Sequence, residues 1–195
     1  MKTEKQKMLS GELYRASDPE LVADKTRCRE AMRRFNQSLP DTDEWKTAKH
    51  DLLPNACETL YAEPPFYCDY GQHITVGKGV FMNFSCTILD VAPVTIGDNV
   101  MMANNVQLLT ATHPLDVQRR VGNLEEYGLP ITIGDNCWIG GGVIVLPGVT
   151  VGKNCVIGAG SVVNKSIPDN SVAVGNPCRV VKTLSEDEVA LKSAE

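Results

Sequence analysis

His113 is the residue whose position most clearly predicts chemistry. It is one of three histidines, and the nineteen residues that follow it, from Pro114 to Thr132, interrupt an otherwise regular sequence pattern. An imidazole can take a proton from a hydroxyl group and return it to a leaving group, and loops that leave a rigid scaffold often carry function. We therefore predict that His113 is a general base. His50 and His73 are expected to be solvated.

Three further polar residues could serve the same reaction. Asn83 occupies a place in the pattern where small residues are commoner, and its amide could stabilise the oxyanion of a tetrahedral intermediate. A simple turn role is the alternative. Asp69 and Asp90 could accept hydrogen bonds from the hydroxyl groups of a substrate.

A basic segment lies close to the C-terminus of an otherwise acidic chain. Between residues 151 and 182, Lys153, Lys165, Arg179 and Lys182 stand against the single acid Asp169. Such a local excess of positive charge suits a phosphorylated ligand. A solvated edge of the fold is the alternative.

The element that must position these residues is a six-residue repeat from Val76 to Pro168. Every hexad begins with Val, Ile, Leu or Met, and its fifth residue is small or β-branched, as in IGDNCW, IGGGVI and VGKNCV. Only Val94-Thr95 and residues 114–132 break the register. Such periodicity marks a repeat architecture. Three hexads would make an 18-residue coil, and coils would stack through parallel strands about 4.8 Å apart. The pattern predicts a triangular prism of five or so coils with aliphatic side chains inside.

The rest of the chain is expected to flank this prism. Residues 1–57 are predicted to form a helical cap. One helix starts at Ser17-Asp18-Pro19-Glu20 and ends before Pro40, and a shorter one, capped by Asp41 or Thr42, runs to Leu53. Such a cap would cover strand edges that otherwise promote aggregation. Residues 58–182 would form the β-helix, with 114–132 as an expelled loop, and residues 183–195 a C-terminal tail.

Composition excludes several classes of protein. The 195 residues carry a net charge of -5, with 43% hydrophobic and 22% charged residues, which disfavours a nucleic-acid binder. No apolar run approaches the roughly 20 residues of a membrane span, and the first residues lack the apolar core of a secretory signal. We expect a cytoplasmic protein that engages no membrane.

The seven cysteines contain no CxxC pair. Cys86, Cys137 and Cys155 each occupy the fifth place of a hexad, where a small buried residue is expected. We therefore expect neither a required metal nor disulfides, although both remain alternatives.

Several motifs resemble those of a known family. The tandem hexads are similar to those of the hexapeptide-repeat acyltransferases, whose fold is a left-handed parallel β-helix. Six shorter motifs resemble the maltose O-acetyltransferase branch, which includes galactoside and nodulation-type acetyltransferases. They are Glu12-Leu13-Tyr14-Arg15, Cys68-Asp69-Tyr70-Gly71, Asn83-Phe84, Leu89-Asp90-Val91, Ala111-Thr112-His113-Pro114 and Gly175-Asn176-Pro177. With the cap included, the resemblance covers nearly the whole chain.

This resemblance implies an acetyl-CoA-dependent O-acetyltransferase that acts on a sugar of the maltose or glucose type. It implies His113 as general base, Asn83 in contact with substrate and acetyl donor, and Asp69 and Asp90 in contact with the acceptor. The acetyl-CoA contacts that it implies are Asn83, Gly141, Ala159, Asn164, Lys165, Arg179 and Lys182. It also implies a homotrimer in which the histidine of one subunit meets the cofactor-binding coils of another.

The chain departs from the family pattern at a few positions. Ala16 stands where the galactoside relative has an aspartate that contacts sugar, although Asp18 lies nearby in sequence. Gly141 offers only its backbone, and Asn164 replaces a commoner threonine. In the expelled loop, Glu125 and Tyr127 could face the acceptor.

Other functions stay open from the sequence. The acceptor could be a galactoside, an amino sugar or an antibiotic hydroxyl. A metal-dependent enzyme like the γ-type carbonic anhydrases would need three histidine ligands, and a structural prism would need no chemistry at all.

Overall fold

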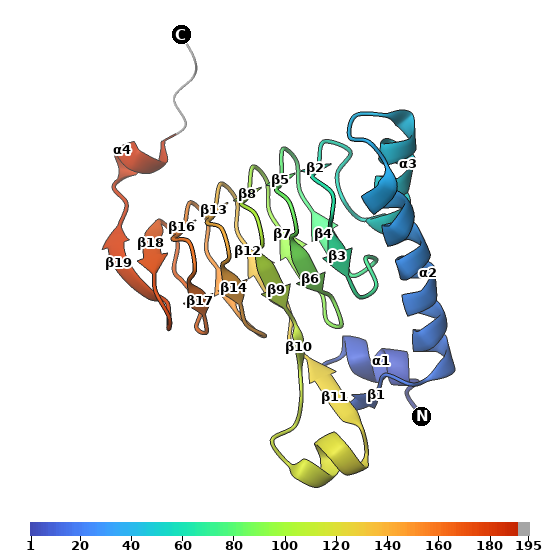
Figure 1. Ribbon diagram of the computed structural model, residues 1–195. Helices are drawn as coiled ribbons and strands as arrows, with labels where there is room; N and C mark the ends of the chain where they lie inside the picture. The colour runs from blue at the N-terminus through green and yellow to red at the C-terminus, as the bar shows by residue number, and fades with distance from the viewer. Residues whose placement is uncertain (191–195) are drawn as a thin grey trace.

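A parallel β-solenoid with three faces forms the body of the protein (Figure 1). The computed structural model describes residues 1–190. The first face contains β4 (Ile74–Val76), β7 (Val94–Ile96), β12 (Ile131–Ile133) and β15 (Thr150–Val151). The second contains β2 (Tyr61–Ala62), β5 (Phe81–Met82), β8 (Met101–Met102), β13 (Trp138–Ile139), β16 (Val156–Ile157) and β18 (Ser171–Val174). The third contains β3 (Tyr67–Cys68), β6 (Thr87–Leu89), β9 (Gln107–Leu109), β14 (Ile144–Val145) and β17 (Val162–Val163). The predicted β-helix is confirmed, with about six turns rather than five.

The hexad pattern folds in this way because its apolar positions point inward. Met82, Met102, Ile139 and Ile157, which lead successive hexads on the second face, are buried. Fully burying a side chain of this size contributes about 1.5–3 kcal/mol. Cys86, Cys137 and Cys155 are buried too, as expected of small inward residues.

The turn between the first and second faces explains the recurrent asparagine of the pattern. Asn99, Asn136, Asn154 and Asn170 all have φ of 57–58°, a left-handed conformation that asparagine tolerates better than most residues. Their side chains donate along the stack, from Asn99 to Asn136 (3.0 Å), from Asn136 to Asn154 (2.9 Å) and from Asn154 to Asn170 (2.7 Å). We call this row the asparagine ladder.

Coil length varies along the solenoid. Tyr61 pairs with Phe81 and Phe81 with Met101, so partners in the early coils are 20 residues apart. In the later coils Trp138 pairs with Val156, 18 residues on. Val94-Thr95, which breaks the hexad register, lies inside the three-residue strand β7 and lengthens that face.

The N-terminal helices cover one end of the solenoid (Figure 1). They are α1 (Glu4–Leu9), α2 (Pro19–Gln37) and α3 (Asp43–Leu52). Asp18 accepts a hydrogen bond from Glu20 N and Thr42 from Trp45 N, so the predicted starts of the two longer helices are confirmed. Phe35 and Trp45 join the solenoid core. The predicted folding units, with boundaries at 57 and 182, stay a prediction.

The expelled loop returns to the body as part of a small antiparallel sheet. Its strands are β10 (Ala111–Thr112), β11 (Glu125–Gly128) and, from the start of the chain, β1 (Tyr14–Arg15), with a π-helical turn η1 (Gln118–Gly122) at the tip. The excursion therefore begins before His113. The solenoid resumes at Ile131, where β12 pairs with β7, two residues earlier than predicted.

The C-terminal segment closes the other end. β19 (Arg179–Thr183) pairs antiparallel with β18, and α4 (Glu186–Val189) follows. The predicted tail, residues 183–195, therefore starts with the end of β19 and continues into α4. Its residues 191–195 lie outside the part of the chain that the structure describes. No helix within residues 1–190 is both long and apolar enough to cross a membrane.

Candidate functional site

One edge of the third face gathers the predicted acceptor residues and the predicted base. Asp69 follows β3, Asp90 follows β6 and Thr110 follows β9, all where this face turns toward the first. Asp90 and Thr110 occupy matching places in their coils, whereas Asp69 lies one residue earlier, level with Leu89. Thr110 accepts a hydrogen bond from Ala92 N at 3.0 Å and donates to Leu89 O at 2.6 Å, which ties the stack together. β10 then leads the chain outward to His113. We call Asp69, Asp90, Thr110 and His113 the histidine corner.

His113 is accessible at this corner and faces a carboxylate. Its side chain is 54% exposed, and Nε2 lies 3.9 Å from Glu126 Oε2 on β11. The other oxygen of Glu126 accepts a hydrogen bond from the hydroxyl of Tyr14, a buried residue of β1. Burial and this contact with Glu126 raise the pKa of Tyr14 far above its ordinary value, so the phenol stays protonated and donates. A fixed carboxylate beside an imidazole can orient it and stabilise its protonated form.

Glu126 is a site residue that the sequence prediction missed. The sequence allows Glu125 and Tyr127 to face the acceptor without requiring it. Side chains alternate along a strand, so β11 presents Glu126 on the opposite side from these two. Tyr14 pairs with Glu126 in the strand register. This pairing joins residues 112 positions apart, which no local pattern reveals.

Asp90 lies behind the corner rather than in its opening. Its side chain has no exposed area, and Oδ1 accepts hydrogen bonds from Asp69 N (3.0 Å) and Tyr70 N (2.8 Å), while Oδ2 accepts from His73 N (3.3 Å). In this conformation a sugar hydroxyl cannot reach the carboxylate, which differs from the predicted direct contact. Asp90 instead holds the turn that presents Asp69.

His73 also differs from prediction. We expected a solvated side chain, but it is only 9% exposed and its Nδ1 lies 2.8 Å from Asp90 O. His50, by contrast, is exposed as expected.

Asp69 offers the accessible carboxylate of the corner. Its side chain is 26% exposed and lies 4.0 Å from Lys25 Nζ. Partial burial raises the pKa of Asp69 above its ordinary value, with Lys25 opposing the shift and the negative charges of Asp90 and Glu126 adding to it. A carboxylate kept partly from water accepts hydrogen bonds strongly.

The opposite edge of the third face holds a second set of predicted residues. Asn83 follows β5, and Gly140 and Gly158 occupy the same place after β13 and β16, each bonded through its N–H to the next coil. We call Asn83, Gly140, Gly141, Gly158 and Ala159 the glycine corner. A Cβ on Gly140 would lie 2.6 Å from Ala159 N, so only glycine lets these coils approach so closely.

Asn83 keeps a free donor at the glycine corner. Its Oδ1 accepts from Phe84 N at 2.7 Å, and its Nδ2 donates to no group in residues 1–190. The side chain is therefore oriented by its own backbone and has an amide N–H left for a ligand.

The predicted phosphate-binding cations lie toward the C-terminal end. Lys165 follows β17, which places it on the same edge as the histidine corner but in a later coil. Arg179 donates to Asn164 Oδ1 at 3.3 Å. Lys182 pairs with Glu188 of α4, and this contact lowers the pKa of Glu188 to about 2. Lys182 is thus partly neutralised within its own chain.

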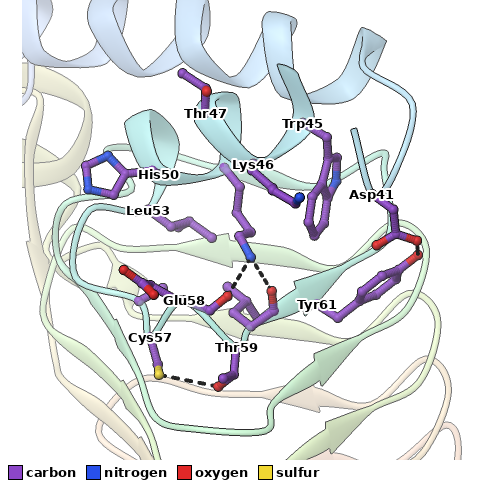
Figure 2. A pocket seen from close by; sticks show the side chains of 13 residues that line it. Asp41, Trp45, Lys46, Thr47, His50, Leu53, Cys57, Glu58, Thr59 and Tyr61 are labelled. Carbon is purple, nitrogen blue, oxygen red and sulfur yellow. Dashed lines mark hydrogen bonds between the residues drawn. The ribbon is translucent and has the colours of Figure 1, made fainter. Parts of the chain in front are cut away.

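Within one chain the two corners do not meet, because they lie at opposite edges of the third face. The structure places Asp69, Asp90 and His113 along one edge of the third face, and Asn83, Gly141 and Ala159 along the other. A hollow beside α3 belongs to neither corner (Figure 2). No group of three or more His, Cys, Asp or Glu side chains within residues 1–190 is arranged to bind a metal ion.

Comparisons with known proteins agree with this architecture. A family model described as the maltose acetyltransferase hexapeptide capping motif matches residues 7–54, and one described as bacterial transferase hexapeptide (six repeats) matches residues 130–165. The fold, the repeats and the cap together define a hexapeptide-repeat acetyltransferase.

Similarity to individual proteins indicates which branch of the hexapeptide-repeat acetyltransferases the chain belongs to. The chain is 50% identical to a crystal structure of a maltose O-acetyltransferase from Clostridium difficile 630, with a TM-score of 0.91 and coverage of 95% of this chain and 99% of that one. A galactoside acetyltransferase in complex with coenzyme A is 38% identical, with a TM-score of 0.91 and coverage of 99% and 98%. The galactoside O-acetyltransferase of Escherichia coli strain K12 is 41% identical over 93% of this chain and 89% of its own length. The chain belongs to the maltose and galactoside O-acetyltransferase family.

Proposed function

We propose that this protein transfers the acetyl group of acetyl-CoA to a hydroxyl of a maltose- or glucose-type sugar, with His113 as the general base. The observation that carries the proposal is the exposed His113 imidazole, which is flanked by Glu126 at 3.9 Å and lies at the corner that Asp69 opens onto. Family membership supports the reaction class, and the coenzyme A complex of the galactoside relative supports the donor.

The positions of these residues suggest the following steps of acetyl transfer. His113 removes the proton of the sugar hydroxyl as its oxygen attacks the acetyl carbonyl carbon, which gives a tetrahedral intermediate. The free Nδ2–H of Asn83 donates to the oxyanion. The carbon–sulfur bond then breaks, the carbonyl re-forms, and the protonated His113 returns the proton to the departing thiolate of coenzyme A.

Acceptor and donor would use different groups. Asp69 accepts hydrogen bonds from the sugar, and Asp90 keeps the Asp69 turn in place. The backbone of Gly141 and Ala159 contacts the pantetheine arm, and Asn164, Lys165, Arg179 and Lys182 face the phosphorylated end of the cofactor. Acceptance of a galactoside, an amino sugar or an antibiotic hydroxyl would be the same chemistry with another pocket.

A complete site on these lines requires more than one copy of the chain. Asn83 and His113 lie at opposite edges of one face, so the histidine corner of one copy would have to meet the glycine corner of another. The outward residues Met101 and Trp138, both more than half exposed on the second face, offer apolar surface for such contacts. A homotrimer fits this requirement because cyclic assembly presents each corner to a neighbour.

The decisive experiment measures thiol release from acetyl-CoA with glucose, maltose, a galactoside, glucosamine and chloramphenicol as acceptors. We expect glucose or maltose to give the highest kcat/KM. His113→Ala should lower kcat about 100- to 10,000-fold, as expected for loss of a general base. The matched control is Gln118→Ala, an exposed residue of the same excursion. Full activity of His113→Ala would overturn the mechanism, and preference for another acceptor would overturn the substrate.

A further inference from the structure

A hollow of about 660 Å³ lies between α3 and the segment that leads into β2, at the start of the row of turns that carries the asparagine ladder (Figure 2). It lies at neither the histidine corner nor the glycine corner. Its volume is in the range of pockets that hold small molecules. The proposed transfer reaction makes no use of it.

The floor of this hollow holds a buried cation without a counter-ion. Lys49 is only 8% exposed, and its Nζ donates to two neutral acceptors, Glu58 O at 3.1 Å and Leu60 O. No carboxylate within residues 1–190 lies within ion-pair distance of it. Burial lowers the pKa of Lys49, and the negative charges of Glu58 and Asp41 oppose this shift only in part. A buried charge is costly unless it is paired.

An aromatic ring packs beside this cation. Trp45 is buried, and its indole N–H has no hydrogen-bond partner within residues 1–190. The Lys49 ammonium lies 4.5 Å from the centre of the Trp45 ring. The Trp45 N–H has no accessible surface, so it does not face an occupant of the hollow, and Lys49 is the group there that calls for an acceptor.

The other residues that line the hollow indicate that its occupant also has an apolar part. Leu53, Ala56, Leu60 and the ring of Tyr61 provide apolar surface. Asp41 and Glu58 also line the hollow, but they are exposed, and Asp41 accepts a hydrogen bond from the Tyr61 hydroxyl at 3.4 Å. Their charges are largely screened by water at the rim, whereas Lys49 acts deeper, where screening is weaker.

We propose that this hollow is a binding site for a small organic anion, a monocarboxylate with a compact apolar body. The carboxylate would take up the unused N–H of Lys49 and supply its missing negative charge, and the apolar body would contact Leu53, Leu60 and Tyr61. The site is independent of the acetyl-transfer site.

Calorimetric titration of the full chain with sodium benzoate tests the proposal, with benzamide as the neutral probe of the same shape. We expect benzoate to bind at least tenfold more tightly than benzamide and to raise the melting temperature. Lys49→Met, which keeps the length of the side chain but removes its charge, should weaken benzoate binding at least tenfold. Lys78→Met, at an exposed lysine that does not line the hollow, should change it less than twofold.

Equal binding of the two probes, or unchanged benzoate binding by Lys49→Met, would overturn the proposal. If Lys49→Met fails to fold, Lys49→Arg retains the charge and should retain the preference for benzoate. The benzoate and benzamide titrations of the unaltered protein still decide the question. Acetyl transfer is not the readout, so failure of the proposed function would leave this result unaffected.

Discussion

Single residues at the histidine corner divide into those that face a ligand and those that support them. His113 and Asp69 are accessible, whereas Asp90, His73 and Tyr14 are buried and act through hydrogen bonds. Glu126 lies between the groups: it touches His113 on one side and is held by Tyr14 on the other. This division makes different predictions for Glu126 and Asp69.

Glu126→Gln should lower kcat about tenfold and leave KM for acetyl-CoA unchanged. The amide keeps an oxygen for the Tyr14 hydroxyl but loses the charge that stabilises a protonated His113 in the transition state. Steady-state kinetics with both substrates varied would measure this split. A larger effect on KM than on kcat would instead place Glu126 in donor binding.

Asp69→Asn should raise the melting temperature at pH 7 by a few degrees while it weakens acceptor binding. The pKa of Asp69 is higher in the folded chain than its ordinary 3.8, so the folded state binds the proton more tightly than the unfolded state. The ionised carboxyl therefore costs stability that grows as the pH rises from about 4 and levels off above the folded pKa. The gain from Asn should disappear at pH 3. Thermal melts across this range measure it, and a gain that is independent of pH would contradict the cause.

Among the elements, those whose signals are local could be predicted from sequence and those formed by distant pairing could not. The solenoid strands follow from the hexads because each inward residue is set by its nearest neighbours in the pattern. The excursion could be located, but its sheet with β1 could not, since Tyr14 and Glu126 are far apart in sequence. Asp90 was misjudged for a related reason: three backbone amides converge on it only once two coils have stacked.

The start of α2 gives a prediction at this scale. Asp18→Ala removes the side chain that accepts from Glu20 N at 3.0 Å and should lower the free energy of unfolding by about 0.5–2 kcal/mol. Ser17→Ala is the matched neighbour and should have little effect. Urea unfolding of both variants measures the difference, and equal losses would mean that Asp18 is not the operative cap.

For the whole molecule, the separation of the two corners is the central fact. Asn83 follows a strand of the second face and Asp90 follows a strand of the third. The place of each residue in the hexad pattern therefore indicates the corner at which it lies. What the pattern could not give is which corners of different copies meet.

A mixing experiment addresses the proposed shared site. His113→Ala and Asn83→Ala should each be nearly inactive, but a mixture refolded together in equal amounts should recover about a quarter of wild-type activity, because about one contact in four would then join an intact His113 to an intact Asn83. Activity of the mixture is compared with that of the separately refolded variants. Absence of any recovery would argue that both residues act within one chain.

The pairing of β1 with β11 has a consequence for how the chain reaches its final state. Contacts between residues 112 positions apart form late, because the intervening chain must first lose its freedom. The solenoid can therefore assemble from neighbouring coils before Tyr14 arrives at Glu126. During synthesis, the surroundings of His113 can form only after Glu126 has been made and the first residues of the chain have returned to it.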